Sequence, residues 1–293
     1  MGIRGLTTYI KQHSSEYLEN IELHDTLLVI DGNNLMCHLY NNPASNCSSC
    51  FGGDYNVFNR CCEKFFTLLK RCRIRPLVIF DGGHERRKLN TIKRRLRSKI
   101  QVTKLISPSK DLCNFPLMIK ENFINVLIKM KIEFAQTLFE ADDIIASLAR
   151  QLNCPVLSND SDFFIYDVQY IPYPSVKHQI KFDQENKIAY IQAKKYSIDY
   201  FLEKFGGMNK EMLPLLATIL GNDYINRSTF SNFFSQIKMP KTKKLPSYSS
   251  QKLIVGVLEW LRNENFDTAK EKVSDYFLLI LSNFNLFSYI FHI

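Results

Sequence analysis

Three short stretches of sequence decide the fold: residues 26–31 read TLLVID, residues 75–81 read RPLVIFD and residues 154–160 read CPVLSND. Each stretch is apolar, contains β-branched residues and ends on an aspartate. Continuous apolar runs of this length are typical of strands that are buried on both faces of a parallel sheet. The stretches therefore predict three parallel strands whose carboxyl ends carry Asp31, Asp81 and Asp160.

Segments with a helical pattern alternate with these strands. Apolar residues recur at spacings of three and four and predict helices at residues 61–70, 120–131 and 140–152. The apolar segments 213–220 and 253–261 are also expected to be helical. Strands that alternate with helices predict an α/β fold in which a central, mainly parallel sheet lies between two helical layers.

Three other segments are less regular. Residues 172–195 are compatible with a hairpin or with a loop, and residues 226–250 are polar and predict a surface loop or a linker. Residues 276–293 are almost entirely apolar and aromatic. We expect a buried tail or a truncation artefact there rather than a membrane anchor, because a bilayer span needs about 20 residues.

Positive charge is concentrated in one place. The net charge is +9, and the stretch 86–104 contains nine Lys and Arg residues and no acidic residue. A localised basic stretch favours contact with a polyanion, and the alternative is a solvated helix face.

The eight cysteines are expected to be reduced thiols, because no secretion signal precedes them. The spacing of Cys47, Cys50, Cys61 and Cys62 is poor for a structural zinc site, since adjacent thiols rarely bind one tetrahedral ion.

Acidic residues gather where the predicted strands end. Ligand sites in parallel α/β sheets lie at the carboxyl ends of the strands, and three strands that end on aspartate indicate more than turn formation. Asp160 and Asp162 are two residues apart, so an extended backbone directs both to one side. Asp223 follows a predicted helix and is a further candidate.

A second acidic group, EADD, occupies residues 140–143. If the helix begins after Glu140, then Asp142 is its better partner, whereas a helix that includes Glu140 favours Asp143. Carboxylates in such numbers repel one another, so either several of their pKa values are raised or a cation neutralises them. A donor set made only of oxygen favours Mg²⁺ or Mn²⁺, and two such ions about 3.5–4 Å apart form the clamp for in-line cleavage of a phosphodiester bond.

Six motifs follow one another along the chain: MGIRGL at 1–6, IDGNNL at 30–35, FDGG at 80–83, EADD at 140–143, NDSDF at 159–163 and GNDY at 221–224. In this order they resemble the structure-specific 5′ nucleases of the flap-endonuclease (XPG-like) superfamily. Four further stretches resemble the asteroid family within it: GGDY at 52–55, CPVLSNDSDF at 154–163, LPLLATILGNDY at 213–224 and VGVLEWL at 255–261.

The resemblance covers residues 1–262 and implies a fold, a domain division and an activity. The fold is a PIN-like three-layer αβα sandwich over residues 1–225, followed by a short helical C-terminal extension, degenerate or truncated, over residues 226–293. The activity is that of an Mg²⁺-dependent structure-specific DNA endonuclease that hydrolyses phosphodiester bonds with two ions. Residues 226–230 (NRSTF) lack the Gly-x-Gly with which the superfamily grips duplex DNA.

The resemblance also implies a set of site residues. The metal carboxylates of the superfamily correspond to Asp31, Asp81, Glu140, Asp142, Asp160, Asp162 and Asp223. Its catalytic Lys and Arg correspond to Lys88 and Arg95. The residues expected to contact nucleic acid are Gly2, Arg4, Arg86, Arg87, Lys93, Arg94, Arg97 and Lys99.

The expected partner is flap or branched DNA at a single-strand/duplex junction, in the nucleus or otherwise in the cytoplasm, without stable membrane association. No protein partner is indicated. Two alternatives stay open: a catalytically weak or inactive nuclease-fold scaffold in signalling, and an RNA-cleaving PIN-type nuclease.

Overall fold

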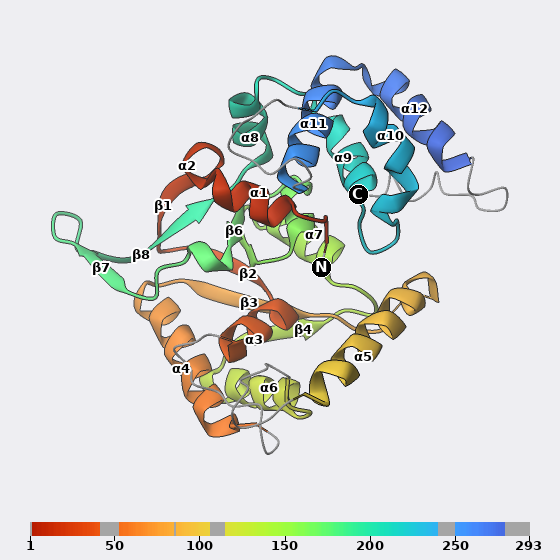
Figure 1. Cartoon of the computed structure of the whole chain (residues 1–293). Coiled ribbons are helices and arrows are strands. Elements are labelled where there is room, and N and C mark those ends of the chain that lie inside the picture. Colours follow the sequence, from red (N-terminus) through yellow and green to blue (C-terminus); the bar gives the residue numbers. More distant parts are fainter. Residues whose placement is uncertain (1, 42–52, 85, 106–114, 240–249, 279–293) are drawn as a thin grey trace. The chain divides into compact units, whose positions relative to one another are not determined.

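The computed structural model of the chain describes residues 2–41, 53–84, 86–105, 115–239 and 250–278 (Figure 1). Contacts within the chain divide it into two compact units. The sheet unit comprises residues 20–159 and 168–195, and the helical unit comprises residues 1–19, 160–167 and 196–293. The domain boundary expected at residue 225 stays a prediction.

A five-stranded sheet forms the centre of the sheet unit, with strand order β4-β3-β2-β5-β6. All four pairings between neighbouring strands are parallel. The strands are β2 (Leu27–Asp31), β3 (Arg75–Phe80), β4 (Glu133–Gln136), β5 (Val156–Ser158) and β6 (Tyr170–Pro172). The three predicted strands are confirmed as β2, β3 and β5, and they occupy the middle of the sheet.

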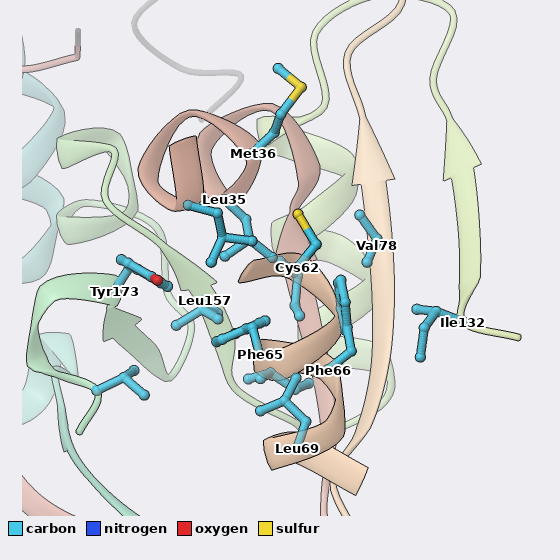
Figure 2. Close-up of a cluster of buried hydrophobic side chains, with 14 of the residues drawn as sticks. Leu35, Met36, Cys62, Phe65, Phe66, Leu69, Val78, Ile132, Leu157 and Tyr173 are labelled. Carbon is cyan, nitrogen blue, oxygen red and sulfur yellow. The ribbon is translucent and has the colours of Figure 1, made fainter. Parts of the chain in front are cut away.

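Helices cover both faces of this sheet. One face packs against α3 (Gly32–Asn41), α4 (Tyr55–Arg71) and α6 (Ile119–Met130), as Figures 1 and 2 show. On β2 the side chains of Leu28 and Ile30 enter that core. Helix α7 (Asp142–Gln151) packs on β2 and β5. The expected three layers are therefore confirmed within this unit.

A second sheet in the sheet unit has the order β1-β8-β7. It contains β1 (Glu19–Leu23), β7 (Ile180–Asp183) and β8 (Ile188–Lys195), and β7 pairs antiparallel with β8. Residues 172–195 thus form a hairpin after a short 3₁₀ turn at Tyr173–Ser175, which settles the alternative that the sequence left open.

Two histidines pack against one buried tyrosine in this unit. The ring of His38 stacks on Tyr173 at 5.0 Å, and His178 meets the same ring edge-on at 5.6 Å. Tyr173 belongs to the core that Figure 2 shows, together with Phe65. Desolvation where the rings pack lowers the pKa of both imidazoles, of which His38 is half-buried and His178 is exposed, so both rings are neutral in the folded protein at neutral pH.

This arrangement predicts a stability that depends on pH. The folded-state pKa values lie below the unfolded value of about 6.5, so the unfolded chain takes up protons first as the pH falls. The free energy of unfolding should therefore decrease as the pH falls from about 6.5 through the lowered folded values. Urea unfolding between about pH 7.5 and pH 5.5 measures this, and a His38→Phe/His178→Phe variant should show a flatter dependence. An equal slope in both proteins would contradict the explanation.

The helical unit is built from short helices. They are α1 (Leu6–Gln12), α2 (Ser14–Tyr17), α8 (Ile198–Phe205), α9 (Leu213–Leu220), α10 (Ser231–Gln236), α11 (Ser250–Asn263) and α12 (Phe266–Leu278), with 3₁₀ turns η4 (Ser161–Phe164), η6 (Lys210–Met212) and η7 (Arg227–Phe230). Helices α9 and α11 confirm two of the predicted helices.

The prediction of a loop over residues 226–250 is wrong for its first part, which forms η7 and α10. Phe230 and Phe233 are buried there, and Phe233 meets the ring of Trp260 at 4.8 Å. Burial of these aromatic rings, and the contact of Phe233 with α11, stabilise helical turns that the polar composition of the segment does not indicate. Residues 240–249 lie outside the described residues.

The first three residues of the apolar tail 276–293 end helix α12. Residues 279–293 lie outside the described residues, so the expected state of the tail stays untested. Within the described part of the chain, no helix is both long and apolar enough to cross a membrane.

Candidate functional site

The carboxylate of Asp31 is held at the carboxyl edge of the five-stranded sheet. It is 8% exposed. One carboxylate oxygen accepts a hydrogen bond from the backbone N–H of Asn34, and the other accepts one from the hydroxyl of Ser158, both at 2.9 Å. Ser158 is the last residue of β5, which neighbours β2. Two adjacent strand ends therefore fix the direction of this carboxylate.

Asp81 follows β3, and its side chain connects two further segments. Its Oδ1 accepts from the backbone N–H of Ala141 at 2.8 Å, and its Oδ2 accepts from the amide of Asn33 at 2.6 Å. The N–H groups of Gly82 and Gly83 donate to the carbonyl groups of residues 139 and 138 at 2.7 and 2.8 Å. These bonds join the end of β3 to the segment that leads into α7.

Glu140 and Asp142 flank the residue whose N–H binds Asp81. Helix α7 begins at Asp142, and Glu140 precedes its N-cap Ala141. The helix therefore starts after Glu140, which is the condition under which Asp142 is the better partner. Asp142 is half-buried, whereas Asp143 is exposed. The structure thus favours Asp142 over Asp143, and its role as a ligand stays a prediction.

Lys88 forms an ion pair with Glu140, with 2.6 Å between Nζ and the carboxylate. The lysine ends a 3₁₀ turn, η3 (Arg86–Lys88), and stands at the N-cap of α5 (Leu89–Thr103). Arg95 is half-buried on the same helix. The expected catalytic lysine thus lies beside an expected metal ligand.

Helix α5 carries most of the basic stretch. Among its described residues none is buried. The side chains of Leu89, Leu96 and Ile100 are 44, 52 and 55% exposed. The basic residues expected to contact nucleic acid on or just before this helix are exposed where their side chains are described, namely Arg86, Lys93, Arg94, Arg97 and Lys99. The side chain of Arg87 lies outside the described part. A helix without a buried face and with this charge suits contact with a polyanion.

In the helical unit, Gly2 lies against two of the predicted carboxylates. A Cβ atom on Gly2 would collide with the carboxylate of Asp160 and the hydroxyl of Ser161, and would lie 2.6 Å from Oδ1 of Asp162. Both aspartates therefore lie beside Gly2, but Asp162 belongs to the 3₁₀ turn η4 and not to the extended segment that was expected from the sequence. Asp160 also caps η4 by accepting from the N–H of Asp162 at 3.3 Å.

Asp223 lies in a turn that follows α9, and the side chain of the preceding residue, Asn222, stabilises this turn. The Asn222 side chain accepts from the N–H groups of Tyr224 and Ile225, both at 2.9 Å. This compact turn fixes the backbone on either side of Asp223.

Arg227 connects this turn to the N-terminal segment of the helical unit. Its guanidinium donates to the carbonyl of Leu220 at 2.8 Å and to the carbonyl of Arg4 at 2.6 Å. The N–H of Arg4 in turn donates to the carbonyl of Gly221 at 3.1 Å. Sequence reasoning missed this residue, because a single arginine in a polar segment has no local signature.

The seven predicted carboxylates are thus divided, with Asp31, Asp81, Glu140 and Asp142 in the sheet unit and the other three in the helical unit. Over the described ranges, no three His, Cys, Asp or Glu side chains form a cluster that could hold a metal ion. Cys61 and Cys62 belong to no disulfide, and Cys47 and Cys50 fall outside the described residues. Hydrogen bonds hold the carboxylates of Asp31, Asp81 and Asp160, and an ion pair with Lys88 holds that of Glu140.

Comparison with known proteins identifies the family. An XPG N-terminal domain model matches residues 1–101, and an XPG domain containing model matches residues 121–278. Protein asteroid of Drosophila melanogaster is 39% identical over 323 residues, which cover 93% of this chain and 37% of that protein. The single-strand DNA endonuclease ASTE1 of Homo sapiens is 40% identical over 265 residues, which cover 89% of this chain and 39% of that protein. The chain belongs to the asteroid family of XPG-domain proteins.

This asteroid-family chain spans less than half the length of the curated relatives that it matches. Among solved structures, the catalytic core of Rad2 in complex with DNA substrate matches it with a TM-score of 0.55 and 16% identity, over 98% of this chain and 84% of that one. At this identity the likeness concerns the fold. The expected three-layer nuclease fold of the asteroid family is thereby confirmed.

Proposed function

We propose that this asteroid-family chain is the nuclease core of a structure-specific DNA endonuclease that requires Mg²⁺ or Mn²⁺. The observation that carries the proposal is the position of Asp31, Asp81, Glu140 and Asp142 at the carboxyl edge of one parallel sheet. This edge is where open α/β folds bind their ligands. A basic helix, α5, begins beside the same carboxylates.

The donor chemistry of this group fits a hard divalent cation. Every candidate ligand is an oxygen, which Mg²⁺ and Mn²⁺ prefer. Each oxygen of Asp31 and Asp81 accepts a hydrogen bond from the protein, and a carboxylate oxygen can accept more than one partner. The amide oxygen of Asn33 is buried and has no hydrogen-bond partner among the described residues. When bound, two such ions would activate a water molecule and stabilise charge on the leaving oxygen.

The remaining residues have roles that follow from their charge and place. We propose that Lys88 and Arg95 hold the phosphate that is cleaved, and that the exposed basic residues of α5 hold neighbouring phosphates. From the resemblance, Asp160, Asp162 and Asp223 remain proposed metal ligands. Gly2 and Arg4 remain proposed contacts of the DNA path.

Flap or branched DNA is the proposed substrate, and the name of the human relative, a single-strand DNA endonuclease, supports a single-stranded element in it. A DNA substrate also implies the nucleus as the proposed location.

Cleavage assays on the purified chain test this function. End-labelled flap DNA, single-stranded DNA and an RNA of equal sequence are incubated with Mg²⁺, with Mn²⁺ or with a chelator. We expect cleavage of DNA that depends on the metal. It should be lost in an Asp160→Ala/Asp162→Ala variant that has retained its thermal midpoint.

The other outcomes separate the alternatives. A preference for RNA would favour the PIN-type ribonuclease. Calorimetric binding of Mn²⁺ without cleavage of any substrate would favour the scaffold, and absence of both binding and cleavage would refute the proposed metal site.

A further inference from the structure

The ion pair between Lys88 and Glu140 is unusually well shielded from water. The lysine side chain is 13% exposed and the glutamate side chain is 24% exposed. The cations of three other pairs, Arg73–Asp25, Lys129–Glu63 and Lys272–Glu264, are 64, 71 and 48% exposed. Screening by water and salt is weaker for a shielded pair, so its attraction is stronger than that of a surface pair.

The location of Lys88 makes this partner important. The lysine stands at the N-cap of α5, where the helix dipole is positive and disfavours a further positive charge. Glu140 offsets that cost. Glu140 also immediately precedes Ala141, whose backbone N–H donates a hydrogen bond to the carboxylate of Asp81. The ammonium group of Lys88 therefore neutralises Glu140, a carboxylate next to the residue that binds Asp81.

We propose that Lys88 is the resident counter-cation of Glu140, and that a divalent cation must displace its ammonium group in order to use this carboxylate. This inference rests on the proposed function. Metal loading and release of Lys88 are then one coupled event. The lysine becomes available to a substrate phosphate only when a metal ion has replaced it beside Glu140. The protein thereby avoids a bare carboxylate before loading.

The inference predicts opposite effects of one substitution on two measurements. In Lys88→Met the competing charge is gone, so Mn²⁺ should bind about tenfold more tightly without nucleic acid, from the typical strength of a charged hydrogen bond. Mn²⁺ should also raise the thermal midpoint of this variant more than that of the wild type. Cleavage should fall, because the phosphate loses a cation. A purely structural role of Lys88 would lower both metal affinity and cleavage.

The experiment is calorimetric titration of Mn²⁺ into the wild type, Lys88→Met, Glu140→Gln and the double variant. The effect of Lys88→Met on affinity should vanish in the Glu140→Gln background, because the lysine acts through that carboxylate. Lys129→Met is the matched control, since it removes a lysine from an exposed pair with Glu63 at 2.7 Å, and it should leave affinity within about twofold.

The two proposals fail in different ways. Mn²⁺ binding that is equal or weaker in Lys88→Met would overturn the counter-cation inference and leave the metal site intact. Absence of Mn²⁺ binding in all four proteins would overturn both. Binding in Lys88→Met without binding in the wild type would support the inference in its strongest form.

Discussion

Replacing Asp81 with Asn should reduce DNA cleavage at least about 100-fold, because loss of a neighbour that merely orients a metal ligand already costs 10–100-fold in such sites. The substitution removes one negative charge and leaves the shape of the side chain unchanged. The fold should tolerate it. The oxygen of the new amide can accept the hydrogen bond from the N–H of Ala141. Its nitrogen can donate to Asn33 if the Asn33 amide flips, because the oxygen of that amide, which has no hydrogen-bond partner among the described residues, then faces it.

Single-turnover cleavage of flap DNA measures this effect, together with calorimetric binding of Mn²⁺ and the thermal midpoint. Asp54→Asn is the matched control in the same unit. Asp54 caps α4 by accepting from the N–H of Val57 at 2.9 Å, and asparagine caps a helix about as well. The control should cleave like the wild type. If Asp81→Asn also cleaves normally, Asp81 has no part in the reaction.

Replacing Gly82 with Ala should destabilise the protein by about 3 kcal/mol, at the upper end of the usual cost of overpacking. A Cβ atom at Gly82 would collide with the carbonyl of Thr137 and lie 2.6 Å from the carbonyl oxygen of Leu138. These are backbone atoms, which cannot turn away as a flexible side chain can. The segment would have to move, and its hydrogen bonds to Gly82 and Gly83 would be strained.

Gly83 provides the matched control for this substitution. A Cβ atom there would lie 3.4 Å from the carbonyl oxygen of Leu138, which is an ordinary contact distance, so Gly83→Ala should cost less than about 1 kcal/mol. Urea unfolding of the two variants measures the difference. Gly82→Ala should also impair cleavage, because the displaced segment carries Glu140. Equal stability of the two variants would show that the segment adapts freely.

The central fold could be predicted from local patterns. The runs that became β2, β3 and β5 are apolar along their whole length, because the middle strands of a parallel sheet are buried on both faces. Helix α9 begins and ends at the predicted residues, 213 and 220. By contrast, β4 is exposed at every position and has no apolar run, so the sequence did not predict it. Its strand conformation depends on the pairing with β3.

The sequence by itself also determined the family, because the order of short motifs does not depend on packing. The tertiary structure alone decided which residues meet across long stretches of the chain. Ser158 reaches Asp31 across 127 positions, Ala141 reaches Asp81 across 60, and Arg227 reaches Arg4 across 223. The pairing of Lys88 with Glu140 is of the same kind. Such contacts leave no periodic trace in a sequence, since they exist only when strands and helices that are distant along the chain have packed together.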